Sequence, residues 1–359
     1  MKLTQGGLPE AGKEAGGRRA KSLRGPGSSR KGTGSPMDTA LFVICFAAAV
    51  SLAAAPPGAA AQEPLEKVCG DLKFPEGPAW DGRGTLYFSN CAADTISRLG
   101  PDGDFTYEWM KGSESPEKSP FRKTNGITVF RDGSLFICDY GLNAIVRLDP
   151  RTKKGEVYAD GCDGEPFRGP NDLAFDPAGN LYFTDPVGSG RDNPVGCVYR
   201  VEAGTRKVTR VAGGLAFPNG LAFSADGSFL YVCESHQNRV VRFPVGRDGS
   251  LGQMEPFADL SPSGPGEPDG MAVDSSGRLW VTHFGAHCVL IIGTDGKIVR
   301  RVEVPHTEAN GYGPTNIEFA GDDLKTVYIT DPGSAALFRM RSDVPGLPLF
   351  CSPMDRPGR

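Results

Sequence analysis

A hairpin-like motif recurs six times along this chain, and such a repeat restricts the fold to an array of similar units. Each copy starts with a polar residue, continues as an apolar segment, turns, and ends in a second apolar segment. The copies read EGPAWDGRGTLYFSN, NGITVFRDGSLFICD, NDLAFDPAGNLYFTD, NGLAFSADGSFLYVCE, DGMAVDSSGRLWVTH and TNIEFAGDDLKTVYITD. Their first residues, which we call the anchors, are separated by 49, 46, 48, 50 and 46 residues. A period near 48 residues built from short strands is typical of β-propeller blades.

Two positions keep their character through the repeat. An apolar residue stands four places after every anchor: Trp80, Val129, Phe175, Phe223, Val273 and Phe319. A glycine stands eight places after the first five anchors, at 84, 133, 179, 227 and 277, and Asp323 replaces it in the sixth. We therefore predict an all-β, six-bladed propeller over residues 62–351, with four-stranded antiparallel blades around a central channel and a short tail at 352–359. The stretch near Cys69 is expected to pair with ALFRMR and close the ring, which hides the sheet edge.

The N-terminal 61 residues differ in composition from the repeat. Residues 1–36 are rich in Gly, Ser, Lys and Arg and have no apolar period, which predicts a disordered basic extension. Residues 37–61 contain an apolar stretch that ends in Ala59-Ala60-Ala61, and this pattern predicts a cleaved signal for export to the periplasm or beyond. An uncleaved membrane anchor is the alternative, although the apolar run is short for a spanning helix. Met37 is an alternative start.

Charge and cysteine content narrow the class of partner. Removing residues 1–61 would take away 8 basic and 3 acidic residues and leave 31 against 40, a formal charge of −9. This balance argues against nucleic acid and suits a cation-binding protein. Eight cysteines would remain, an even number that permits disulfides in an exported protein. Cysteines within apolar strands, as in FICD and YVCE, are better explained as buried free thiols.

The anchors form a candidate metal site. Equivalent positions of six blades lie on a ring around the channel, and each anchor is expected to precede an inner strand and face one mouth. The ring reads Glu76, Asn125, Asn171, Asn219, Asp269 and Thr315. All six carry side-chain oxygen, as Ca²⁺ prefers, and an all-oxygen set argues against zinc and copper. Ordinary turn chemistry is the better explanation for any single anchor. It explains the ring less well, because the anchors vary while the surrounding pattern does not.

The motifs FPEGPAW, TNGITV, GPNDLAFDPAGNLYFTDP, FPNGLAFSADGSFLYV, EPDGMAVDSSGRLWVTHFG and PTNIEF, in this order, resemble the gluconolactonase, senescence marker protein and luciferin-regenerating family of six-bladed propellers. The likeness covers nearly all of residues 63–345. It implies a divalent-metal site formed by Glu76, Asn171, Asn219 and Asp269. Ca²⁺ is the expected metal, with Zn²⁺, Mn²⁺ and Mg²⁺ as alternatives. Asn125 and Thr315 would complete the ring and face substrate.

The resemblance implies hydrolysis of a sugar lactone or a similar small cyclic ester. The metal would polarise the ester carbonyl, water would attack, and Asp269 is the best candidate for the base. Arg168 and His283 are further candidates for substrate binding, Asp172 for orienting a ligand, and Glu234, Asp139, Asp185 and Asp331 for capping loops on the far side. An aryl esterase or phosphotriesterase on the same metal, and a non-catalytic binding propeller, are the alternatives. A monomer with no stable membrane association after signal removal is expected, because a closed ring leaves no obligatory edge.

Overall fold

A computed structural model describes residues 64–306, 311–350 and 352. All described residues belong to one compact unit, Glu63–Arg359. The predictions for residues 1–36, 37–61 and all but one residue of 352–359 therefore lie outside the described residues. In the described part of the chain, no helix is long and apolar enough to cross a membrane.

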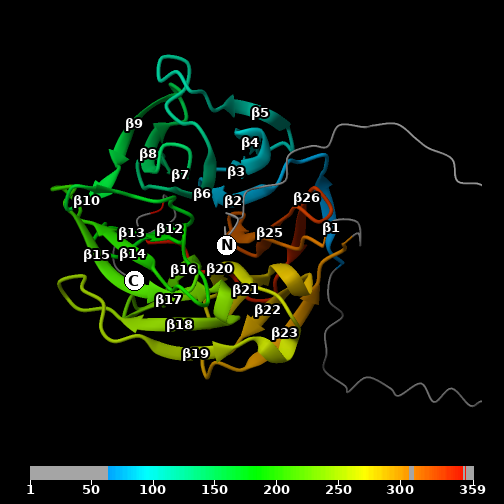
Figure 1. The fold of residues 1–359 in the computed structure, drawn as a ribbon. Helices are drawn as coiled ribbons and strands as arrows, with labels where there is room; N and C mark the ends of the chain where they lie inside the picture. Colours follow the sequence, from blue (N-terminus) through cyan, green and yellow to red (C-terminus); the bar gives the residue numbers. More distant parts are fainter. Residues whose placement is uncertain (1–63, 307–310, 351, 353–359) are drawn as a thin grey trace, which may run out of the picture. The chain divides into compact units, whose positions relative to one another are not determined.

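Six antiparallel four-stranded sheets follow one another around an axis, as predicted (Figure 1). Blade 1 contains β2 (Pro75–Trp80), β3 (Leu86–Asn90), β4 (Thr95–Leu99) and β5 (Phe105–Lys111). Blade 2 contains β6 (Thr124–Val129), β7 (Leu135–Asp139), β8 (Ala144–Asp149) and β9 (Lys154–Ala159). Blade 3 contains β12 (Leu173–Phe175), β13 (Leu181–Asp185), β14 (Gly196–Val201) and β15 (Val208–Leu215). The hairpin of β10 (Gly161–Cys162) and β11 (Glu165–Pro166) precedes blade 3.

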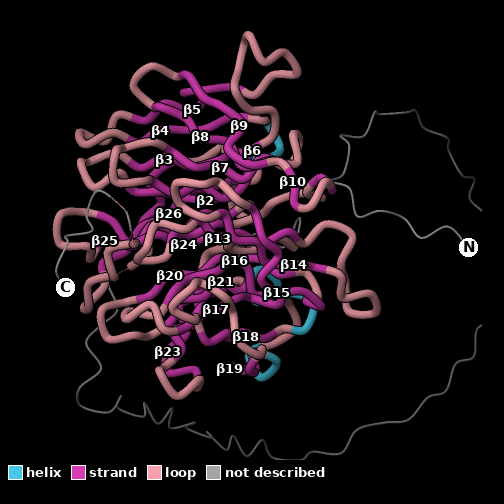
Figure 2. Tube along the Cα trace, turned by 90° about the vertical axis from the view of Figure 1, so that its left-hand side faces the viewer, coloured by secondary structure: helices cyan, strands magenta, loops and turns pink. Residues whose placement is uncertain are grey.

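The second half of the ring repeats this arrangement. Blade 4 contains β16 (Pro218–Phe223), β17 (Phe229–Glu234), β18 (Arg239–Pro244) and β19 (Glu255–Asp259). Blade 5 contains β20 (Pro268–Val273), β21 (Leu279–His283), β22 (Cys288–Ile292) and β23 (Ile298–Glu303). Blade 6 contains β24 (Asn316–Ala320), β25 (Thr326–Asp331), β26 (Ala336–Arg341) and β1 (Glu66–Cys69). Four short 3₁₀ helices, η1 (Cys91–Ala93), η2 (Ser235–Gln237), η3 (Ser261–Ser263) and η4 (Phe284–Ala286), lie toward one side of the propeller (Figure 2).

The ring closes as the sequence predicted. Strand β1 pairs antiparallel with β26, with Glu66 opposite Arg339 and Cys69 opposite Leu337. The Arg339 guanidinium also donates to both carboxylate oxygens of Glu66, at 2.8 and 2.9 Å. The first described strand thus becomes the outer strand of the last blade and pairs the edge that β26 would otherwise leave open.

The repeated glycines and apolar residues have the predicted roles. The five glycines eight places after the anchors all have positive φ, between 69° and 110°, which glycine adopts without strain. They turn each inner strand back into its neighbour. The apolar residues four places after the anchors pack between blades, as Phe175 does against Phe136 at a ring-centroid distance of 5.1 Å. Burial of these side chains is the main favourable term that holds the blades together.

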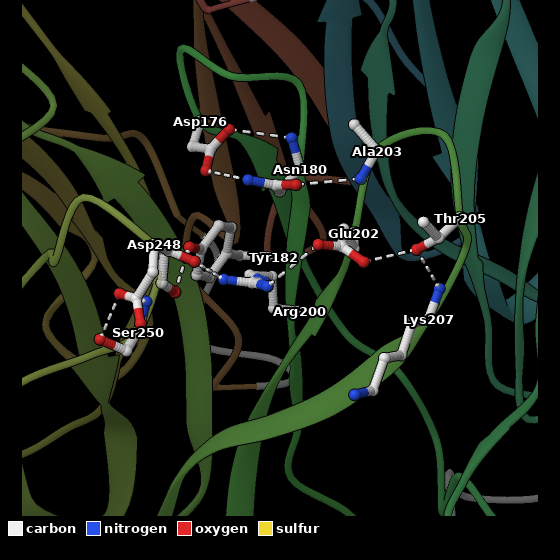
Figure 3. A network of polar contacts seen from close by, with 11 residues as sticks. Asp176, Asn180, Tyr182, Arg200, Glu202, Ala203, Thr205, Lys207, Asp248 and Ser250 are labelled. Atoms are coloured by element: carbon white, nitrogen blue, oxygen red, sulfur yellow. Dashed lines mark hydrogen bonds and ion pairs between the residues drawn. The ribbon is translucent and has the colours of Figure 1, made fainter.

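Polar contacts add to this packing between blades 3 and 4 (Figure 3). The Tyr182 hydroxyl, on the second strand of blade 3, donates to the Gly249 carbonyl in the turn between β18 and β19, at 2.6 Å. The Arg200 guanidinium donates to the Asp248 carbonyl in the same turn. Asp176 accepts from the backbone and side chain of Asn180 at 2.8 and 2.7 Å, which closes the turn after β12. This network therefore belongs to the scaffold.

Four of the six anchors lie within their inner strands, although all six were predicted to precede them. Glu76, Asn125, Asn219 and Asp269 are the second residues of their inner strands, and only Asn171 and Thr315 precede theirs. The reason is a break in the strand pairing directly after the anchor, as between Glu76 and Ala79 in blade 1. The extended backbone starts before this irregularity, which the sequence pattern does not show.

The residues that end the second strands lie beside the anchors, and their predicted position on the far side is wrong. Antiparallel pairing sets Pro218 against Glu234 and Thr124 against Asp139. They do hold loops: Asp139 accepts hydrogen bonds from the backbone N–H groups of residues 122, 123, 141 and 142. The predicted free thiols are also confirmed, since Cys138 and Cys233 are fully buried and all seven described cysteines are unpaired.

Candidate functional site

Five polar side chains meet at the anchor end of the channel and form what we call the axial cluster. Its members are Glu76, Asp172, Asn219, Asp269 and Asn316, and each is 4–9% exposed. The Asn316 amide donates to Glu76 at 3.4 Å and also hydrogen-bonds Asp172. The Asn219 side chain hydrogen-bonds Asp269. Blades 1, 3, 4, 5 and 6 thus each contribute one side chain to a buried polar group, in which Asp269 also feels the charges of Glu76 and Asp172.

The inner strands lie so close together that only some blades can place a side chain in the channel. In blades 1, 2, 4 and 5 the residue after the anchor is glycine: Gly77, Gly126, Gly220 and Gly270. A Cβ on Gly220 would lie 2.5 Å from the Asp269 carbonyl oxygen, so the next blade leaves no room there. A Cβ on Gly270 would lie 2.2 Å from the side-chain oxygen of Asn316. Blades 3 and 6 carry Asp172 and Asn316 at this position, and these two side chains occupy the space that the glycines leave.

Asp172 and Asn316 bridge the channel. Blades 3 and 6 stand opposite each other in a six-membered ring (Figure 1). The hydrogen bond between these two side chains therefore crosses the axis. Asp172 also accepts from the backbone N–H of Leu173 at 2.9 Å and from that of Leu221 in the next blade. These contacts hold its carboxylate in the middle of the cluster.

Three carboxyls share this buried space, and their pKa values rise as a result. Burial first, and the charge of Asp172 second, raise the pKa of Glu76 to about 8. Burial raises the pKa of Asp172 to about 6. Burial and the charges of Glu76 and Asp172 raise the pKa of Asp269 well above its ordinary range. Clustered acids of this kind are typical of sites that bind cations or transfer protons.

The donor set fits a hard divalent cation. Carboxylate and amide oxygens are the ligands that Ca²⁺ takes, and a cation among the three acids would offset their repulsion. The side-chain oxygen of Asn125 is buried and has no hydrogen-bond partner among the described residues. A buried orphan acceptor of this kind lacks a donor or a cation. Within the described residues, no group of three or more His, Cys, Asp or Glu side chains is placed so that it could hold a metal ion.

The structure brings together three of the four predicted metal ligands through their side chains, namely Glu76, Asn219 and Asp269. The fourth, Asn171, directly precedes Asp172 and is half-buried. Its backbone carbonyl accepts from Gly126 of the neighbouring blade at 2.9 Å. Its role as a ligand stays a prediction, as does the substrate-facing role of Asn125.

Two predicted substrate contacts require correction. The Thr315 hydroxyl is fully buried and donates to the Pro75 carbonyl at 2.8 Å, which joins blade 6 to blade 1. His283 is also fully buried, and its Nε2 lies 2.8 Å from the side-chain oxygen of Asn238. Burial lowers the pKa of His283 to about 4. Both side chains are therefore used by the scaffold.

Arg168 lies apart from the axial cluster. Its side chain is exposed and donates to the Val195 carbonyl at 3.4 Å, and its backbone N–H donates to Asp185. A role toward substrate stays a prediction for this residue.

Sequence reasoning missed Asn316 and Glu318 as channel residues and assigned Asp172 only an orienting role. For Asp172 and Asn316, the sequence did offer an indication, because copies three and six lack the glycine that follows the anchor in the other four. Glu318 stands three places after its anchor, where the other blades carry Ala79, Thr128, Ala174, Ala222 and Ala272. It lines a channel cavity of about 90 Å³, which extends from Asp172 and Asn316 to Leu347–Phe350. Burial raises the pKa of Glu318 well above its ordinary range.

Comparison with known proteins identifies the family. Residues 74–332 match the family described as SMP-30/Gluconolactonase/LRE-like region. The chain belongs to this family. A gluconolactonase of Zymomonas mobilis is 31% identical over 257 residues, which are 65% of this chain and 70% of that protein. A 6-deoxy-6-sulfogluconolactonase of Pseudomonas putida is 28% identical over 291 residues, which are 77% of this chain and 94% of that protein.

Solved structures of family members share the fold. A gluconolactonase from Xanthomonas campestris superposes with a TM-score of 0.66 at 26% identity and covers 79% of this chain and 90% of its own. Regucalcin from Agrobacterium tumefaciens, a calcium-binding protein, superposes with a TM-score of 0.66 at 23% identity and covers 80% of this chain and 97% of its own. The family and the propeller expected from the motifs are thus confirmed.

Proposed function

We propose that this protein hydrolyses lactones with a divalent metal ion, preferably Ca²⁺, held by Glu76, Asn171, Asn219 and Asp269. The observation that carries the proposal is the axial cluster, in which buried acids converge with amide oxygens from several blades. The lactonases among its relatives support the reaction class. A propeller that only binds a partner has no need for such a cluster, because three buried acids destabilise the fold.

The proposed mechanism assigns each part of the cluster a task. The metal, when bound, supplies Lewis-acid stabilisation of the charge that develops on the ester carbonyl oxygen. Asp269 accepts the proton of the attacking water, since it is a buried carboxylate at the anchor end of the channel and belongs to the proposed metal site. Asn316 holds both Glu76 and, across the channel, Asp172, and so fixes the cluster before substrate arrives.

The first test is hydrolysis of glucono-1,5-lactone by the chain from residue 62 onward, followed by proton release. We expect activity that EDTA abolishes and added Ca²⁺ restores. Tight Ca²⁺ binding without activity on any lactone would favour the aryl esterase or phosphotriesterase alternatives. Absence of divalent-metal binding would overturn the proposal. Export through residues 37–61 and a monomeric state are part of the same proposal and rest on the sequence.

Metal-free protein is expected to lose stability as pH rises, and metal-loaded protein is not. The pKa of Glu76 rises from 4.5 to about 8 on folding, so between these values the folded chain binds more protons than the unfolded chain. Stability contributed by this group is therefore full below pH 4.5 and is lost as pH approaches 8. Calorimetry in EDTA between pH 5 and 8 should show a falling Tm that Ca²⁺ flattens. Glu76→Gln should reduce the slope in EDTA, and an unchanged slope would contradict this account.

A further inference from the structure

A second ring of residues lies two positions before the anchors, at the rim of the channel mouth. The backbone shows that these positions are equivalent. The carbonyls of Phe74, Lys123, Phe217 and Glu267 each accept from the residue that follows the second strand of their blade, at 2.9–3.0 Å. The backbone of these four residues therefore lies beside the anchors at the same end of the channel.

Phe74 and Phe217 hold unusual backbone conformations at this rim. Their φ angles are 54° and 59°, in the left-handed region that bulky residues rarely adopt. Both side chains are half-buried, and blades 1 and 4 stand opposite each other around the channel. Strained backbone that is retained at the edge of a site indicates a functional placement of the side chain. Blades 1 and 4 thus each carry a half-buried aromatic residue two positions before the anchor.

Phe74 belongs to an aromatic wall with Phe284 and Tyr312. The centroid of Phe74 lies 5.6 Å from that of Tyr312 and 6.4 Å from that of Phe284, and the Phe284 and Tyr312 centroids are 5.6 Å apart. All three side chains are half-buried. A Cβ on Gly313 would lie 2.0 Å from the Phe284 carbonyl oxygen, so the backbone behind the wall is closely packed. The wall is a preformed apolar surface.

The aromatic wall adjoins the axial cluster. Phe74 is separated from Glu76 by one residue, and its carbonyl accepts from Cys91, whose thiol feels the charges of Glu76 and Asp269. Phe284 donates its N–H to the Glu267 carbonyl, two residues before Asp269. On the opposite side, the Phe217 ring stacks on His236 at 4.7 Å. A lactone whose carbonyl is near Asp269 would therefore place a substituent against aromatic carbon.

We propose that the aromatic wall of Phe74, Phe284 and Tyr312 selects lactones that carry an uncharged hydrophobic substituent. This inference rests on the proposed function and names the substrate class of the same site. Aromatic faces bind apolar groups by excluding water and by ring–ring contact. On the face of the aromatic wall, a polyhydroxylated substituent would have hydroxyls that meet only carbon and stay unpaired, which is unfavourable. The preferred substrate is therefore more apolar than gluconolactone.

A matched pair of lactones tests the inference. We expect kcat/KM for γ-phenyl-γ-butyrolactone to exceed that for γ-butyrolactone by on the order of tenfold, mainly through a lower KM, because the phenyl group is buried against the wall. Tyr312→Ala should bring this ratio close to 1, and Tyr312→Phe should retain it because the ring remains. Phe74→Asn should also lower the ratio, and Asn tolerates the positive φ at this position.

Tyr158→Ala is the control, since Tyr158 is also a half-buried tyrosine but lies on the outer strand β9. It should leave the ratio unchanged. The inference would be overturned if both lactones had equal kcat/KM, or if Tyr312→Ala did not change the ratio of the two kcat/KM values. Either result would leave the lactonase proposal standing. No hydrolysis of either lactone or of gluconolactone would overturn the proposed function and the inference together.

Discussion

Asp269→Asn is expected to lower lactone hydrolysis by about 10²- to 10⁴-fold while the propeller stays folded. Asparagine keeps the size of the side chain and an oxygen, so the packing of β20 is preserved. It removes the proposed base and one of the charges that would attract a divalent cation. Steady-state kinetics at saturating Ca²⁺, together with Ca²⁺ titration by calorimetry, should show a loss in kcat and weaker metal binding.

The same substitution should raise the Tm of the metal-free protein. Asp269 is buried next to Glu76 and Asp172, and their mutual repulsion raises the pKa of its carboxyl. A neutral amide at this position relieves the repulsion. Lower activity combined with higher stability in EDTA separates a functional carboxylate from a structural one. Full activity of the variant would remove Asp269 from the mechanism.

Asp176→Asn is the matched control for this experiment. Asp176 is 4% exposed and lies in the turn after the inner strand of blade 3, at the opposite end from the anchor. Its two oxygens accept from Asn180, so the substitution should lower the Tm and leave kcat/KM unchanged (Figure 3).

Gly220→Ala is expected to destabilise the protein by about 2–3 kcal/mol or more and to lower activity at least about tenfold. The added Cβ would lie 2.5 Å from the Asp269 carbonyl oxygen and 2.6 Å from the Gly270 Cα. Both contacts are with backbone of the neighbouring blade, so no side-chain rotation relieves them. The inner strand of blade 5 must shift, and Asp269 shifts with it. Denaturant unfolding and kinetics measure the two effects.

Gly213→Ala provides the comparison on the exposed outer strand β15. A Cβ there would have the Cys197 sulfur, at 3.8 Å, as its nearest neighbour. Its stability should stay within about 0.5 kcal/mol of the original chain. Equal stability of the Gly220 and Gly213 variants would show that the inner strands do not pack as closely as described here.

Much of this protein could be predicted from its sequence because the repeat carries redundant information. Six copies of one hairpin predict six blades, and the glycines at a constant offset predict turns that the positive φ angles confirm. The closing strand was predictable for the same reason, since an open ring leaves an edge that must be paired. Family membership followed from the order of the motifs, and the family match confirms it.

Which side chains point into the channel depends on the distances between neighbouring blades. The sequence of one blade does not show these distances. The anchors Glu76, Asn219 and Asp269 were predicted, whereas Asn316 and Glu318 were not. Thr315 and His283 were assigned to substrate, although the scaffold uses both side chains.

Sequence by itself determined the number of blades, the turn positions and the chemistry of the anchors, because these are local and repeated. Tertiary structure alone decided which side chains reach the axis. Four inner strands meet their neighbours so closely that only glycine fits after the anchor, and the space they leave admits Asp172 and Asn316. The positions of these two side chains are set by packing between blades. This packing joins residues that are distant in sequence, so it exists only in the closed ring.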